Sequence, residues 1–167
     1  YRVHRETGQM IWRAHVGAPV MSSPAIDGRM VVFGASDGAI RGVSATDGKH
    51  LWSHQTAKTV IASPAVHDGT AYVGSADGHM YALATIGGGL LWKTAVCRQI
   101  TSTAAVDGGR LYVGGNDAAF YCLDREAGSV SWRFGTGGAV ISRPLVTTDH
   151  LIFGSMDGTI YALHRSA

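Results

Sequence analysis

The chain of 167 residues has little charge, few cysteines and no long apolar run. Asp, Glu, Lys and Arg together make up 16% of the residues, and the formal net charge of +2 is scattered along the chain. Without a basic cluster, a nucleic-acid-binding face is not predicted. No apolar stretch approaches the ~20 residues that cross a bilayer, so no membrane span is predicted. We interpret Cys97 and Cys122 as small apolar residues, which do not by themselves indicate an oxidising compartment.

A sustained helical period is also absent, and a much longer period is present instead. Three kinds of residue recur every 40 positions: Trp12, Trp52, Trp92 and Trp132; Gly34, Gly74, Gly114 and Gly154; Asp37, Asp77, Asp117 and Asp157. A fixed period of this length indicates a repeat array, in which each copy buries its apolar face against its neighbours.

Each copy holds four short runs of β-prone residues. In the second copy these runs cover residues 61–66, 71–75, 80–84 and 90–94. Asp68-Gly69 and Asp77-Gly78 separate the first three runs, and an Asp-Gly pair predicts a type I′ hairpin turn with positive φ at both residues. Four antiparallel strands per ~40 residues are typical of a β-propeller blade. We therefore predict an all-β propeller with about four four-stranded blades.

The predicted domain covers residues 1–167. Residues 1–16 form the last strand of a preceding or partner blade, residues 17–56, 57–96 and 97–136 form complete blades, and residues 137–167 form a blade without its last strand. Closing four blades into a ring requires a turn of about 90° per blade, whereas rings of about seven or eight blades turn by roughly half as much. We expect either a half ring that self-association completes, or a fragment of one longer seven- or eight-bladed ring.

The recurring aromatic and acidic residues have structural interpretations. Because a tryptophan occurs in the fourth run of every copy, we expect these rings to pack between blades and not to bind substrate. A ring of the repeated aspartates could bind calcium. However, Asp37, Asp77 and Asp157 each precede a glycine, which favours turns in which the carboxylate accepts backbone N–H groups.

Several segments together resemble the repeats of one known family. The segments Glu6–Trp12 and Ser44–Trp52 are similar to the tryptophan-docking motif Ala-x-Asp-x-x-Thr-Gly-Lys-x-x-Trp of quinoprotein propellers. Ser22–Ile26 and Tyr72–Gly78 are similar to other parts of the same repeats. The third copy follows the motif at Asp124, Gly128 and Trp132, with Cys122 in place of its alanine. The chain therefore resembles the PQQ-like, or quinoprotein-type, β-propeller repeat family over essentially its whole length.

The resemblance implies a fold but no single activity, because this family includes quinone-dependent dehydrogenases and propellers without a quinone. The dehydrogenases hold pyrroloquinoline quinone (PQQ) with calcium, a stacking tryptophan, a base aspartate and often a disulfide between adjacent cysteines. Here the adjacent cysteines are missing, all four tryptophans have docking positions, and no Cys-x-x-Cys-His haem motif occurs. We expect no PQQ, no calcium and no other metal in this segment.

Candidate site residues are those at which a copy departs from its own pattern. Ser23, Ser63 and Thr103 share a position at which the last copy has Arg143, and the first strand of a propeller blade lines the central channel. Lys58 and Arg98 lie in the loops before two first strands, and Asn116 lies between a second and a third strand. We predict that Arg143, Arg98, Lys58 and Asn116 form one cationic face that binds a carboxylate or an acidic peptide. The alternative is that Arg143 pairs with an aspartate while the other cations are solvated.

We therefore predict a non-catalytic scaffold that binds a protein, a peptide or a small ligand through its loop face. The main alternative is a fragment of a PQQ-dependent dehydrogenase whose cofactor site lies outside these residues. A lectin-like module is a third function, although no copy repeats an exposed aromatic ring beside paired polar groups. The family resemblance also implies a periplasmic or other extracytoplasmic location.

Overall fold

The structure is a computed structural model and describes residues 1–165, which contain strands and no helix. An N-terminal pair of strands consists of β1 (Arg2–Val3) and β2 (Met10–Trp12). The first blade consists of β3 (Ala25–Asp27), β4 (Met30–Gly34), β5 (Ala39–Ser44) and β6 (His50–Gln55). The second blade consists of β7 (Ala65–His67), β8 (Thr70–Gly74), β9 (His79–Ala84) and β10 (Leu90–Ala95).

The remaining strands repeat this arrangement. The third blade consists of β11 (Ala105–Asp107), β12 (Arg110–Gly115), β13 (Ala119–Asp124) and β14 (Val130–Gly135). The fourth sheet has three strands, β15 (Leu145–Val146), β16 (His150–Gly154) and β17 (Ile160–His164). Every pairing is antiparallel between strands that are consecutive in the chain. The predicted class of an all-β propeller with four-stranded antiparallel blades is therefore confirmed.

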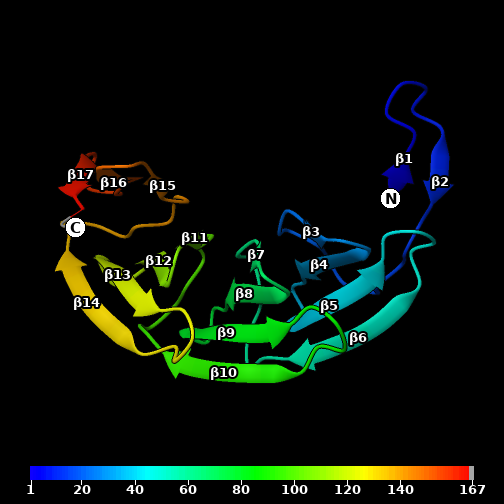
Figure 1. Cartoon of the computed structure of the whole chain (residues 1–167), viewed down its shortest axis with the longest axis horizontal. Helices are drawn as coiled ribbons and strands as arrows, with labels where there is room; N and C mark the ends of the chain where they lie inside the picture. Colours follow the sequence, from blue (N-terminus) through cyan, green and yellow to red (C-terminus); the bar gives the residue numbers. More distant parts are fainter. Residues whose placement is uncertain (166–167) are drawn as a thin grey trace.

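The blades stand side by side along an arc (Figure 1). The first strands β3, β7, β11 and β15 lie on the concave side and contact one another in sequence, whereas β6, β10 and β14 lie on the convex side. The two ends of the chain lie at opposite ends of the arc. Among residues 1–165 no helix is long and apolar enough to cross a membrane.

The hydrophobic core lies between the blades. One cluster joins the first and second blades through Trp52 and Val73, and a second cluster joins the second and third blades. A third cluster joins the third and fourth blades, where the rings of Phe120 and Phe153 stack with centroids 3.9 Å apart. Because each ring covers a neighbouring sheet, aromatic burial is a main source of cohesion along the arc.

The first strand of the second blade begins later than the sequence predicts. The run at 61–66 forms a strand only at β7, from Ala65 to His67. Pro64 has no N–H to donate to a ladder. In the first copy a side chain takes the place of the ladder, because the Ser22 hydroxyl donates to Gly34 O (3.0 Å) and accepts from Gly34 N (2.8 Å). Ser102 and Ser142 bind the equivalent glycines in the same way.

The two predicted Asp-Gly turns of the second blade also differ from each other. Asp68 and Gly69 both have positive φ, 47° and 72°, as a type I′ turn requires. In the other turn only Gly78 has positive φ, 86°, so the type I′ prediction is wrong there. The Asp77 carboxylate accepts the N–H of His79 and stabilises a different turn.

Candidate binding site on the loop face and in the central hollow

The connections between blades are fixed to the turns of both neighbouring blades. In the second blade Ala76 N donates to Thr59 O (3.0 Å), and Ile100 N of the following connection donates to Ser75 O (3.1 Å). Equivalent bonds recur one copy later. This side of the sheets, which we call the loop face, consists of connections 17–24, 56–64, 96–104 and 136–144 and turns 35–38, 75–78, 115–118 and 155–158. Because it is bonded on both sides, the backbone of the loop face has a defined position relative to both neighbouring blades.

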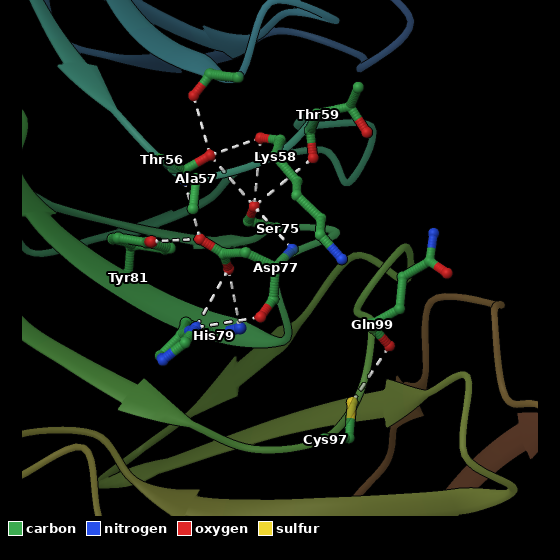
Figure 2. Close-up of polar contacts among 11 residues, drawn as sticks. Thr56, Ala57, Lys58, Thr59, Ser75, Asp77, His79, Tyr81, Cys97 and Gln99 are labelled. Carbon is green, nitrogen blue, oxygen red and sulfur yellow. Dashed lines mark hydrogen bonds and ion pairs between the residues drawn. The ribbon is translucent and has the colours of Figure 1, made fainter.

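Thr56 is the centre of one such junction (Figure 2). Its hydroxyl lies 2.9 Å from Gly38 O and 2.6 Å from Lys58 O, either of which can accept its proton, and 3.1 Å from the Ser75 hydroxyl. Thr56 is 5% exposed and Ser75 is fully buried. Buried hydroxyls with several partners stabilise the position of the chain between the first and second blades.

The Asp77 carboxylate extends the same network (Figure 2). One oxygen accepts the Tyr81 hydroxyl (2.6 Å) and Ala57 N (3.1 Å), and the other accepts His79 N (3.0 Å). Burial opposes the ionisation of Asp77, but the hydrogen bonds from Tyr81, Ala57 and His79 outweigh it and lower the pKa of the carboxyl. The predicted turn role of the repeated aspartates is confirmed for Asp37, Asp77 and Asp157.

The turn of the third copy has different chemistry. The Tyr121 hydroxyl still donates to one oxygen of Asp117 (2.6 Å), but the other oxygen, Oδ1, is buried without a hydrogen-bond partner. Ala118 has positive φ, 59°, where the other copies have glycine. The nearby Cys97 thiol donates to Gln99 O (3.1 Å), and burial raises the pKa of this thiol. Both Cys97 and Cys122 are free thiols.

Lys58 and Arg98 occupy the same position in successive copies and are both exposed. Their backbones are closely packed, because a Cβ on Gly38 would lie 2.7 Å from Lys58 O and one on Gly78 would lie 3.1 Å from Arg98 O. Asn116 is half-buried, and its side-chain oxygen accepts the Thr101 hydroxyl (2.9 Å). The side chain of Asn116 therefore already has a partner within the loop face.

Arg143 lies in a hollow on the concave side of the arc. This hollow of about 450 Å³ brings Arg143 together with Ser23, Ser63 and Thr103, its equivalents in the other copies. Ser23 N donates to the Ser63 hydroxyl across the first two blades (2.8 Å). Within residues 1–165 the exposed Arg143 side chain forms no ion pair with an aspartate. Lys58, Arg98 and Asn116 do not line the hollow, so the four candidate residues fall into two groups.

Sequence reasoning missed His67, which also lines the hollow. Its Nε2 lies 3.0 Å from Asp68 Oδ2. A signal for this residue was available, because the first and third copies have Asp27 and Asp107 at the position of His67. Across the described residues no group of three His, Cys, Asp or Glu side chains has the arrangement of a metal site.

Three of the four tryptophans are bound to the blade that follows. The indole N–H groups of Trp12, Trp52 and Trp92 donate to backbone oxygens 33 residues ahead, at distances of 2.8 to 3.0 Å. Each ring also covers a glycine with positive φ. In the second blade, for example, a Cβ on Gly88 would lie 2.5 Å from the Trp52 ring. Trp132 occupies the equivalent strand position in β14 and is 39% exposed.

The tryptophan-docked, four-stranded blades define the class of protein as a β-propeller. The chain belongs to the PQQ-like family, whose model matches residues 1–103 and 82–166 and is described as outer membrane protein assembly factor BamB. The family resemblance noted in the sequence is therefore confirmed. No curated protein sequence matches the chain.

Solved structures show the same fold. BamB from Moraxella catarrhalis aligns with a TM-score of 0.86 and 22% identity, over 98% of this chain and 54% of that one. The computationally designed Ika4 protein aligns with a TM-score of 0.82 and 19% identity, over 96% of this chain and 100% of that one. Quinohemoprotein alcohol dehydrogenase ADHIIG from Pseudomonas putida HK5 aligns with a TM-score of 0.74 and 18% identity, over 86% of this chain and 30% of that one. This chain thus spans about half of the Moraxella protein.

Proposed function

We propose that the chain is a non-catalytic propeller scaffold that binds a carboxylate-bearing protein or peptide through Arg143 in the hollow. The observation that supports this proposal most directly is the replacement of a small hydroxyl residue by an exposed guanidinium on the concave side. Around Arg143, Ser23, Ser63 and Thr103 offer further hydrogen-bonding groups. A guanidinium with free N–H groups can bind a carboxylate with two parallel hydrogen bonds.

Lys58 and Arg98 provide a second contact for the same partner. Both are exposed on the loop face, whereas the Asp77 side chain between them is only 5% exposed and faces its own hydrogen-bond donors. This part of the loop face therefore exposes the positive charges of Lys58 and Arg98 and buries the negative charge of Asp77, which favours an acidic partner. The description of the family as an outer membrane protein assembly factor agrees with a partner that is a protein.

Three of the four tryptophans and both cysteines count against a quinone site in this segment. Trp12, Trp52 and Trp92 are held against the next blade by their indole N–H groups, so these rings are not free to stack on a cofactor. Cys97 lies in the connection 96–104 and Cys122 lies in β13, so the two free thiols are not adjacent in the chain. These observations favour the scaffold over a dehydrogenase whose cofactor site lies within this segment.

Fluorescence anisotropy with a labelled oligoglutamate peptide tests the scaffold proposal, with oligolysine as the probe of opposite charge. We expect oligoglutamate to bind and oligolysine not to bind. Arg143→Ser, which restores the residue of the first two copies, should weaken binding about tenfold, because hydrogen bonds between charged groups are lost. Arg98→Ala should have a smaller effect, about twofold, because exposed pairs are screened by solvent.

Arg29→Ser is the matched control, because Arg29 is an exposed arginine in the turn between β3 and β4, away from the loop face. Equal losses for Arg143→Ser and Arg29→Ser would show that only net charge matters and would overturn the proposal. A separate assay adds PQQ and calcium with a redox dye and an alcohol. Dye reduction that depends on the chain would establish the dehydrogenase alternative.

A further inference from the structure

A second hollow lies between the second and third blades, at the ends of the strands opposite to the loop face. It has a volume of about 330 Å³ and is formed by the β7–β8 turn, β8, β10 and the β13–β14 turn. In an antiparallel blade the turns after the first and third strands lie at the same end, so these turns face away from Lys58 and Arg98. The interblade groove, as we call this hollow, is thus separate from Lys58 and Arg98, and it shares His67 with the wall of the hollow that contains Arg143.

The residues of the interblade groove differ from those at the equivalent junction between the first and second blades. At the junction between the first and second blades the equivalent positions are mainly apolar, and Thr85 closes on Asp27 with a hydrogen bond of 2.6 Å. At the second junction four of these positions gain new polar groups: Thr70, Tyr72, Arg125 and Glu126 replace Met30, Val32, Thr85 and Ile86. These four residues come from two segments about 55 positions apart, yet they line the same hollow. Tyr72 and Arg125 have Tyr112 and Arg165 as equivalents one copy later, so their combination with Asp68, Thr70 and Glu126 is what distinguishes this junction.

The walls of the groove have fixed geometry. The Trp92 indole donates to Arg125 O (3.0 Å), and its ring lies 5.9 Å from the ring of Tyr72. Asp68 Oδ2 lies 3.0 Å from His67 Nε2 and 3.4 Å from an Arg125 terminal nitrogen. The Arg125 side chain is only 18% exposed, so its guanidinium stays in the groove.

The charged side chains that line the groove disfavour the binding of a simple anion or a simple cation. A carboxylate that approached Arg125 would meet the carboxylates of Asp68 and Glu126, and an ammonium that approached Glu126 would meet the Arg125 guanidinium. The hydroxyls of Thr70 and Tyr72 and the guanidinium offer donors, while the two carboxylates offer acceptors. A neutral ligand with several hydroxyl groups can satisfy both kinds of partner, because each of its hydroxyls donates and accepts.

We propose that the interblade groove binds a saccharide. The exposed Leu91 side chain and the edge of Trp92 line the groove beside the polar groups. They provide an apolar surface for the C–H groups of a sugar ring. The volume of the groove suits one sugar unit, which is smaller than the ligands of most pockets of several hundred Å³.

Titration of the nitrogen-labelled chain with glucose, N-acetylglucosamine, maltose and cellobiose, followed by amide chemical shifts, tests this assignment. We expect saturable shifts at Thr70, Glu126 and Gly128 with at least one of the four sugars. Glu126→Gln keeps the shape of an exposed side chain but removes an acceptor charge, and should weaken sugar binding about fivefold. Arg125→Thr, which restores the residue of the preceding blade, should abolish the shifts.

Asp47→Asn is the matched control, because Asp47 is an exposed acid in the equivalent turn of the first blade. It should leave sugar binding unchanged, and so should Arg143→Ser, which separates this site from the carboxylate site. Unchanged amide spectra of the variants without ligand would show that the fold is intact. The absence of saturable shifts with all four sugars would overturn the proposal. Shifts at the groove with glycine or lysine and none with the sugars would overturn it as well, since they would indicate a site for zwitterions.

Discussion

The Asp77 turn and the Asp117 turn occupy the same place in successive blades but have different polar chemistry. At Asp77 both carboxylate oxygens have donors, and the following residue is Gly78 with positive φ. At Asp117 one oxygen is buried without a partner, and the following residue is Ala118 with positive φ. The interblade backbone bonds are present at both turns. The repeat is therefore held by backbone geometry and packing, while side-chain chemistry in the turns can vary.

The largest expected effect comes from exchanging the residues after the two aspartates. In Gly78→Ala the new Cβ would overlap Cys97 O, and the residue would keep a φ of 86°. We expect a loss of about 3 kcal/mol in the free energy of unfolding, from backbone strain and overpacking. In Ala118→Gly the relief of strain is offset by a more flexible unfolded chain, so the change should stay below about 0.5 kcal/mol. Denaturant unfolding measures both, and equal losses would contradict the comparison.

A smaller difference is expected when each aspartate becomes asparagine. Asp77→Asn places an amide nitrogen where an oxygen now accepts an N–H or O–H group, and should cost about 2 kcal/mol because a buried donor loses its acceptor. Asp117→Asn can turn its nitrogen toward the position of Oδ1, which has no donor, and should change stability by less than about 0.5 kcal/mol. Thermal unfolding at neutral pH provides the test. A larger loss for Asp117→Asn would show that Oδ1 has a partner such as a bound water.

The first copy offers a third form of the turn and the smallest effect. Asp37 pairs with Arg41 where the later copies have a tyrosine, and this hydrogen bond lowers the pKa of Asp37 from 3.8 to about 2. Because the folded-state pKa is lowered, the stabilisation is present above about pH 4 and is lost as the pH falls toward about 2. Both side chains are partly exposed, so the loss should stay below about 1 kcal/mol. Thermal unfolding measured across this range should show it, and Asp37→Asn should remove this part of the pH dependence.

Much of the fold could be predicted because its main contacts repeat with the sequence period. A tryptophan that recurs every 40 residues needs a receiving surface at the same interval, and Gly48, Gly88 and Gly128 provide it. The start of β7 could not be predicted from its apolar run. The run 61–66 is β-prone throughout, but Pro64 has no N–H to donate, and backbone pairing begins only at Ala65. In the first and third copies the Ser22 and Ser102 hydroxyls bind glycines 12 positions ahead, and local propensity does not reveal such bonds.

For the candidate sites, the place of a residue within its blade could be predicted from the repeat. Which residues of different blades lie close together could not. Arg143 could be placed on the concave side because its equivalents lie beside first strands. Whether Lys58 and Arg98 share a surface with Arg143 depends on the radial distance of each loop from the centre of the arc, which a linear pattern does not contain. The interblade groove is a stronger example. Glu126 and Tyr72 lie 54 positions apart in the sequence, and only the fold brings them to the same groove.

The indole bonds of Trp12, Trp52 and Trp92 also have a consequence for how the chain assembles. Each bond spans 33 residues, whichever copy it starts from. The sequence distance over which a new blade must find its neighbour is therefore constant and does not grow with the number of blades. Because loop closure over this distance costs the same at every step, blades can add to a growing array in chain order. One 40-residue unit could thus be duplicated or lost during evolution without any of these bonds having to span a longer stretch of sequence.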